Sequence, residues 1–158
     1  MVAGLTVEEI ARAFLMQESA VRQRITRAKS KIKTAQIPYQ VPAPEDLRVR
    51  IDGVLAVLYL VFNEGYFASG SEMPALRSEL TTEAIRLTRL VRELLPDDAE
   101  VAGILALMLL SEARSPARIT AKGELVRLDE QDRGLWNREL IDEGCLLYTS
   151  PSPRDQRG

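Results

Sequence analysis

The sequence contains no histidine, and its only cysteine is Cys145. One cysteine cannot form a disulfide framework, and the lack of histidine excludes both a Cys/His zinc site and a His-based catalytic triad. The longest apolar run covers residues 53–62, far short of the roughly 20 residues that span a bilayer, and no signal peptide is visible. We therefore expect a cytoplasmic protein with no metal or cofactor and no membrane partner.

Patterns typical of enzymes are also missing. The chain has no phosphate-binding glycine loop and no cluster of metal-ligand residues. Two pairs of acids, Asp97/Asp98 and Asp129/Glu130, lie at expected helix starts, where capping and the helix dipole account for them. We expect that the protein is not an enzyme.

The charge of the chain is unevenly distributed. The 158 residues are 46% hydrophobic and 28% charged, which fits a soluble globular protein of one or two small domains with a net charge of −2. Residues 1–35 carry seven Lys/Arg side chains and three acids, so their net charge is +4 and that of the remainder is −6. A basic head on an acidic body indicates that only the head meets a polyanion.

Residues 4–35 predict a short helix, a tight turn and a longer basic helix. Thr6 precedes Glu9 by three residues, the spacing of a capping box, and Ile10, Ala11 and Phe14 form one apolar face of the first helix. After a turn at residues 15–18, the second helix carries a single apolar stripe at helical spacing. That stripe consists of Val21, Ile25, Ala28 and Ile32.

The other side of the second helix is polar and basic. Two short helices of which the second is basic form the helix-turn-helix arrangement that binds the DNA major groove. An ordinary solvated basic face is the alternative, and the capped first helix and short turn favour DNA. The predicted DNA-binding residues are Arg22, Gln23, Arg24, Thr26, Arg27, Lys29 and Lys31.

After the head, residues 36–46 carry three prolines and predict a linker, because proline lacks the amide donor and restricts its predecessor. A core helix follows over residues 45–62, and Gly65 is placed to end it in a left-handed cap. Asn63, Glu64 and Tyr66 at this corner are either packing residues or a contact surface for a protein partner. We name them as the candidate partner contact.

The rest of the body is also expected to be helical, over residues 47–144. Residues 80–95 and a helix opened by a capping box of Asp97 and Glu100 predict an antiparallel helix pair. Residues 118–128 contain two β-prone pieces around Gly123, a candidate small β-hairpin, and residues 129–143 return to helix. The expected fold is all-α.

Residues 145–158, CLLYTSPSPRDQRG, differ from the rest of the body in their sequence pattern. They show no helical period and carry two prolines separated by one serine. They are similar to a translated cloning or sequencing-adapter tail, and a natural disordered tail is the alternative. We expect a non-native or disordered tail, with the natural chain continuing past Gly144.

Head and body together resemble a known family. TVEEIARAFL and SAVRQRITRAKSKI resemble the helix-turn-helix of region four of bacterial extracytoplasmic-function sigma factors. The following segments resemble the tetratricopeptide-like carboxy-terminal extension of one sigma-factor subgroup: LAVLYLVFNEGYFASG, EAIRLTRLVRELLPDDAEVAGILALMLLSEARSPAR and LDEQDRGLWNRELIDEG. The resemblance covers nearly all of residues 4–144, and the extension is its more specific part.

The resemblance implies promoter recognition in transcription initiation, as a dissociable subunit of RNA polymerase. Arg22, Gln23 and Thr26 match the positions that face bases of the −35 element, and glutamine suits adenine as arginine suits guanine. The remaining cations would contact phosphates. The extension implies regulation, or contact with a regulatory protein or the polymerase core.

Three departures from the family pattern are visible. Leu15 holds the turn position that is usually glycine, so the left-handed conformation favoured there would be strained. Ala20 replaces a frequent capping threonine, which leaves Ser19 as the candidate cap. Little sequence precedes the helix-turn-helix, so we expect a fragment that lacks the polymerase-binding domain. A stand-alone transcriptional regulator with a helical effector or dimerisation domain, and an interaction module that no longer binds DNA, remain alternatives.

Overall fold

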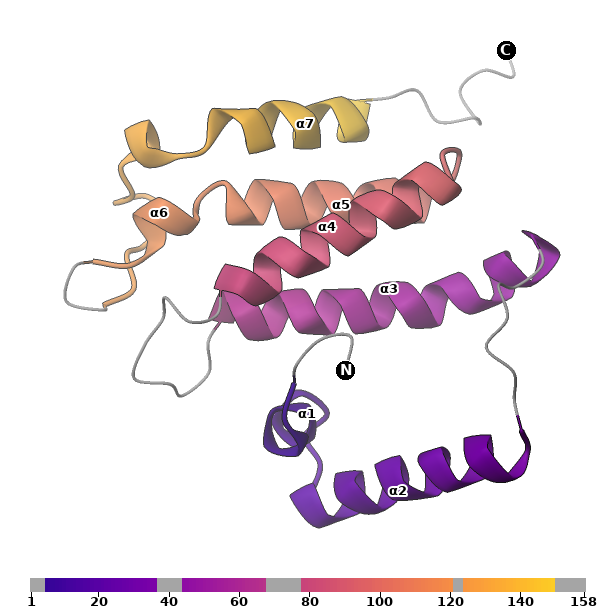
Figure 1. The fold of residues 1–158 in the computed structure, drawn as a ribbon. Coiled ribbons are helices and arrows are strands. Elements are labelled where there is room, and N and C mark those ends of the chain that lie inside the picture. Colours follow the sequence, from indigo (N-terminus) through magenta and orange to yellow (C-terminus); the bar gives the residue numbers. More distant parts are fainter. Residues whose placement is uncertain (1–4, 37–43, 68–77, 121–123, 150–158) are drawn as a thin grey trace. The chain divides into compact units, whose positions relative to one another are not determined.

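The computed structural model describes residues 5–36, 44–67, 78–120 and 124–149. Within these ranges the protein is all-helical, as expected, and the β structure consists of a single isolated bridge (Figure 1). The chain divides into two compact units, residues 1–54 and 55–158, and each is described by itself. The helices are α1 Val7–Ala13, α2 Glu18–Thr34, α3 Pro44–Phe67, α4 Ser78–Leu94, α5 Ala99–Glu112, α6 Ser115–Arg118, the 3-10 helix η2 Arg133–Leu135 and α7 Arg138–Thr149.

Unit 1 begins with the predicted capping box. The Thr6 hydroxyl accepts a hydrogen bond from the Glu9 amide at 3.2 Å, and the Glu9 carboxylate accepts one from the Thr6 amide at 2.7 Å. Two of the amides that a helix start leaves unpaired are thereby satisfied. α1 is therefore fixed at its first turn by its own sequence.

The turn between α1 and α2 is a complete Schellman motif. The Met16 amide donates to the Ala11 carbonyl at 2.8 Å, and the Leu15 amide donates to the Arg12 carbonyl at 3.1 Å. Leu15 adopts the left-handed conformation with φ 51°, which confirms the expectation for this position. The motif reverses the chain within a few residues and sets the direction in which α2 leaves.

The start of α2 corrects the sequence-based assignment. The helix begins at Glu18 with Gln17 as its N-cap, and no side chain caps it. Ser19, the candidate cap, lies inside the first turn. The left-handed Leu15 leaves only Met16 and Gln17 before the helix, so the cap falls two residues earlier than Ser19. α2 ends at Thr34, as the prolines beyond it predict.

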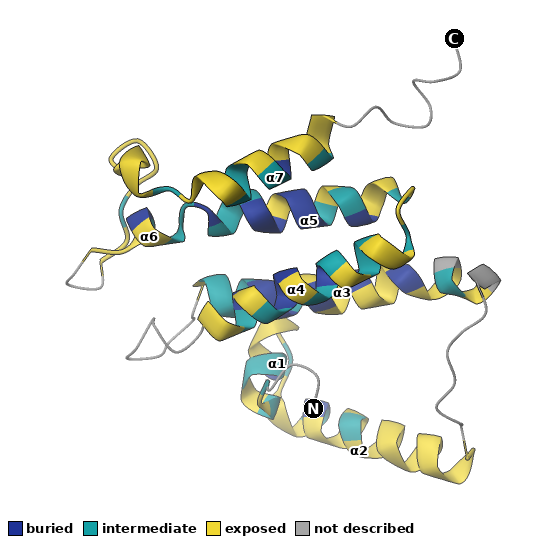
Figure 2. Ribbon diagram, turned by 45° about the horizontal axis from the view of Figure 1, so that its top comes forward, coloured by how far each residue is buried: buried dark blue, intermediate teal, exposed yellow. Residues whose placement is uncertain are grey.

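In unit 2, α5 lies between α4 and α7 (Figures 1 and 2). Its sequence is apolar nearly all round, which is the composition of a helix covered on more than one side. The helix pair α4–α5 is the predicted αα-hairpin. The largest fully buried side chains are Phe62, Leu55, Leu105, Met108, Leu109, Val101, Thr81 and Thr88.

An ion pair joins the outer helices of this stack. The Arg89 guanidinium of α4 donates to both carboxylate oxygens of Glu143 on α7, at 2.8 and 2.6 Å. These hydrogen bonds raise the pKa of Arg89 above its ordinary value. A bidentate pair fixes orientation as well as distance, so it sets the register of α7 along the bundle.

Three predicted boundaries in unit 2 were wrong. Gly65 does not end α3, which continues to Phe67, because Tyr66 remains packed in helical register against Phe62. Asp98, not Asp97, caps α5, and its carboxylate accepts from the Glu100 and Val101 amides. The helix expected from residue 129 starts at Arg138, after the short η2 turn.

The predicted hairpin, tail and linker have different outcomes. An antiparallel bridge joins Ile119 and Leu125 in the segment predicted as a hairpin, whose tip lies outside the described residues. α7 runs to Thr149, so the tail prediction was wrong for residues 145–149, which stay helical because the first helix-breaking proline comes only at residue 151. Residues 150–158 lie outside the described ranges. Most of the predicted linker, residues 37–43, also lies outside them.

Candidate nucleic-acid interface

The polar face of α2 is open to solvent along its whole length. The predicted DNA-binding residues Arg22, Gln23, Arg24, Thr26, Arg27, Lys29 and Lys31 are all exposed. Of the apolar stripe, only Val21 is buried, and it lies on the side of α2 that packs against α1. A helix held along one edge by a short partner helix presents the rest of its circumference as a binding surface.

The three residues expected to face bases lie together. A shallow hollow on α2 is lined by Arg22, Gln23 and Thr26, together with Ser19 and Ala20. The hollow combines guanidinium and amide donors with amide and hydroxyl acceptors, the groups that read base edges.

Two contacts within this hollow constrain its side chains. The Arg22 guanidinium donates to the Glu18 carboxylate at 3.0 Å, and both side chains are more than half exposed. The Thr26 hydroxyl donates to the Arg22 carbonyl one turn earlier, at 3.0 Å. An exposed pair of this kind stabilises by at most about 1 kcal/mol, so Arg22 can exchange Glu18 for a phosphate or a base.

The remaining cations lie to either side of the hollow. At about 100° per residue, Arg24, Arg27 and Lys31 follow one edge of α2 and Lys29 follows the other. A major-groove helix is flanked by the two phosphate backbones of the duplex, so cations on both edges match that geometry. The structure thus brings together the side chains that the sequence assigns to one surface.

The candidate partner contact at the end of α3 has a different character. Glu64 is buried, Asn63 is half-buried, and the Tyr66 ring stacks on Phe62 with centroids 5.5 Å apart. Tyr66 also receives hydrogen bonds from Arg114, at its hydroxyl, and from Arg118, at its carbonyl. These contacts favour the packing interpretation for Tyr66, and the partner contact stays a prediction.

Two arginines of this cluster were not singled out in the sequence. The Arg118 guanidinium lies 3.7 Å above the Tyr66 ring, a cation–π distance, and its hydrogen bond to the Tyr66 carbonyl measures 2.7 Å. Arg114 and Arg118 are four residues apart, so the spacing places them on one side of a helical stretch. That spacing is the signal that could have identified them, although it does not reveal the aromatic partner.

No group of acids and cysteine in the described part of the chain is arranged to hold a metal ion. Of the helices in that part, none has the length and apolarity needed to cross a membrane.

Comparison with known proteins finds similarity to a protein family and to a bacterial relative. A family model described as a family of unknown function (DUF6596) matches residues 50–150, from within α3 to just past the end of α7. An uncharacterized protein of Rhizobium meliloti (strain 1021) is 47% identical over 148 residues, which are 93% of this chain and 34% of that protein. The chain therefore spans about a third of the relative's length. No solved structure matches it.

Proposed function

The chain belongs to DUF6596, a family of unknown function, through residues 50–150. For the part that precedes this match, we propose that the chain recognises promoter DNA through α2. In this proposal it is part of an extracytoplasmic-function sigma factor in the cytoplasm, and α2 reads the −35 element in the major groove. The observation that carries the proposal is the α1–turn–α2 unit, whose exposed face gathers Arg22, Gln23 and Thr26 in one hollow with cations on both edges.

Specificity and affinity come from different residues of this face. Gln23 can pair with the N6 and N7 groups of adenine, and Arg22 with the O6 and N7 groups of guanine once it leaves Glu18. Arg24, Arg27, Lys29 and Lys31 neutralise phosphates and hold the helix in register. Binding by the head alone is therefore weak and strongly dependent on salt.

Unit 2 serves as the regulatory extension in this proposal. Its α4–α5 pair followed by α7 is similar in order to a tetratricopeptide-like array, a scaffold whose stacked helix pairs bind proteins. Contact with the polymerase core or a regulatory protein, including contact through Asn63, would couple promoter binding to a signal.

The test begins with selection of bound sequences from a random duplex library, followed by fluorescence anisotropy on the selected duplex. We expect a slope of log K against log salt of about −4, at about −0.9 for each of the four phosphate-contacting cations. The double change Arg22→Ala and Gln23→Ala should weaken binding at least about tenfold and remove the preference for the selected sequence. Lys29→Gln should weaken binding to all sequences alike.

A charge-matched control lies in unit 2. Arg127→Gln removes one exposed cation far from α2 in the sequence, so it should leave affinity and salt slope unchanged. Equal binding by the Arg22/Gln23 double variant and the parent chain would refute the proposal. A palindromic selected site bound by a stable dimer would favour a stand-alone regulator, because two-fold sites mirror two-fold proteins.

A further inference from the structure

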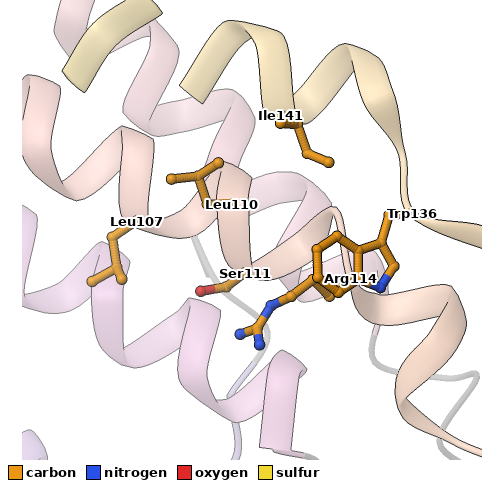
Figure 3. A pocket seen from close by; sticks show the side chains of 6 residues that line it. All are labelled: Leu107, Leu110, Ser111, Arg114, Trp136 and Ile141. Carbon is orange, nitrogen blue, oxygen red and sulfur yellow. The ribbon is translucent and has the colours of Figure 1, made fainter. Parts of the chain in front are cut away.

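Unit 2 contains a hollow between α5 and the segment that leads into α7 (Figure 3). Its volume is about 330 Å³. Small-molecule sites begin at about this size, roughly 300 Å³. The hollow is lined by Leu107, Leu110, Ser111, Arg114, Trp136 and Ile141.

The walls of the hollow are apolar except in one place. Leu107 and Leu110 of α5 and Ile141 of α7 supply aliphatic surface, and Trp136 supplies aromatic surface (Figure 3). The polar residues that line the hollow are Ser111 of α5 and Arg114, which lies between the end of α5 and the start of α6. An apolar cavity with a few polar groups at one side is the usual composition of a ligand site.

The guanidinium of Arg114 has no carboxylate partner among the described residues. Its one hydrogen bond runs from Nη2 to the Tyr66 hydroxyl at 3.3 Å, which is long and involves a neutral acceptor. Arg89, on the neighbouring helix α4, is by contrast held by both oxygens of Glu143. A half-buried cation is stabilised when an anion pairs with it, so Arg114 leaves room for an anion supplied from outside.

We propose that this hollow binds a small monocarboxylate with an apolar body, about eight to twelve heavy atoms in all. The apolar body packs between Trp136, Ile141 and the two leucines. The carboxylate pairs with Arg114 and accepts a hydrogen bond from Ser111. This site is separate from the DNA-binding proposal, since all its residues belong to unit 2.

Trp136 allows a direct measurement, because it is the only tryptophan in the chain. Octanoate added to the full chain should change Trp136 fluorescence saturably, with a Kd below about 1 mM for a ligand of this size. Octanamide, which has the same shape without the charge, should bind at least about tenfold more weakly, because a charge-assisted hydrogen bond is roughly twice as strong as a neutral one. No saturable change, or equal binding of octanoate and octanamide, would overturn the proposal.

Two pairs of variants test the residues involved. Leu107 is half exposed, so Leu107→Glu and Leu107→Gln should both fold, and only the first places a negative charge at the wall. Leu107→Glu should bind octanoate at least about tenfold more weakly than Leu107→Gln, by repulsion across a few ångströms. Equal affinities in this pair would contradict the site.

The second pair compares two arginines near the same ring. Arg114→Met removes the proposed partner of the carboxylate, whereas Arg133→Met removes a cation 5.6 Å from the Trp136 ring that does not line the hollow. Octanoate affinity should fall at least about tenfold in the first variant and stay within about twofold in the second. An equal loss in both would show a general charge effect and overturn the proposal. If Arg114→Met does not fold, the Leu107 pair decides.

Discussion

The two units of the chain are stabilised in different ways. Among the described residues, the largest fully buried side chains all lie in unit 2, where α5 is covered by α4 and α7. In unit 1 the large apolar side chains of Phe14 and Ile32 are 56% and 53% exposed, and Ala11 and Val21 form the small buried contact between α1 and α2. Unit 1 depends on local hydrogen bonds at its cap and turn, and unit 2 on a non-local core.

Because of this difference, the surface proposed to bind DNA and the core that stabilises the fold lie in different units. Local hydrogen bonds fix the start of α1 and the direction of α2 without covering the polar face, so the cations of α2 stay exposed to solvent. A non-local core instead makes unit 2 cooperative, and the ion pair Arg89–Glu143 links two of its helices. The following changes test this comparison.

The largest effect should come from the core of unit 2. Leu109 is fully buried, so Leu109→Ala should lower the free energy of unfolding by about 3 kcal/mol, the sum of lost burial and a new cavity. Urea unfolding followed by Trp136 fluorescence reports this loss, since Trp136 lies in unit 2.

The same helix offers the control for this change. Leu107 is 48% exposed, so Leu107→Ala should cost less than about 1 kcal/mol. Similar losses in the two variants would mean that α5 is not covered as described, and the contrast between the units would fail.

A smaller effect should come from the contact of α5 with α7. A Cβ at Gly144 would lie 3.0 Å from Cγ and 3.1 Å from Cδ2 of Leu110, which is too close for both to keep their positions. Overpacking of this contact destabilises the fold by about 1–3 kcal/mol, and the higher helix propensity of alanine over glycine offsets up to about 1 kcal/mol of that loss. Gly144→Ala should therefore lower the free energy of unfolding by about 1 kcal/mol, measured by the same urea titration.

Gly103 on α5 is the matched position in open space. No atom lies within 4 Å of a Cβ built there, so Gly103→Ala should gain about 0.5–1 kcal/mol from helix propensity alone. If Gly144→Ala also stabilised unit 2, as Gly103→Ala should, α7 would be able to move away from α5 at little cost in free energy.

The sequence predicted the features of this comparison that depend on local rules. The capping box of Thr6 and Glu9, the left-handed Leu15 and the α4–α5 hairpin are each set by residues close in the chain, and all are confirmed. The predicted DNA-binding face needed only the helical period of α2, and the structure gathers Arg22 and Gln23 as that period requires.

Features that depend on contacts between residues far apart in the sequence could not be predicted. Gly65 fits a cap by local rules, but stacking of Tyr66 on Phe62 and its hydrogen bond from Arg118 hold the backbone helical beyond it. Spacing alone did not distinguish Asp97 from Asp98, because the cap depends on which residue leaves the helical conformation. The hollow at Trp136 likewise joins segments that periodicity treats separately.

In unit 1 the strained turn can be relieved by one substitution. Leu15 is 96% exposed in a left-handed conformation, so Leu15→Gly loses little packing. Relief of about 1–2 kcal/mol of strain exceeds the conformational-entropy cost of glycine, and unit 1 should gain about 0.5–1 kcal/mol. Hydrogen exchange of the Met16 amide, which donates to Ala11, should slow about two- to fivefold.

The control for Leu15→Gly is the same substitution at Leu146, a position with ordinary helical conformation. Leu146 is 70% exposed inside α7, so Leu146→Gly should destabilise unit 2 by roughly the propensity difference, about 1 kcal/mol. Faster exchange of the Met16 amide in Leu15→Gly would mean that the leucine side chain contributes to the turn after all.

The smallest effect concerns the carboxylate of Glu112, the last residue of α5. Burial raises the pKa of Glu112 above its ordinary value of 4.5, while hydrogen bonds from Ser115 and Thr81 and the charge of Arg118 oppose the shift. The folded state therefore holds this proton more tightly than the unfolded state. Its stabilising contribution is complete below pH 4.5 and is lost as the pH rises through the raised pKa.

Glu112→Gln removes this dependence, so the variant should be more stable than the parent at pH 7, by less than about 0.5 kcal/mol after solvent screening, and equal to it near pH 4. Glu83 gives the opposite case, because its hydrogen bonds with Arg86 lower its pKa. Glu83→Gln should therefore be less stable than the parent at pH 7 and equal to it near pH 3. Urea titrations at the three pH values measure both differences. The same sign for both variants would mean that burial does not govern Glu112, and that unit 2 is less enclosed than its core indicates.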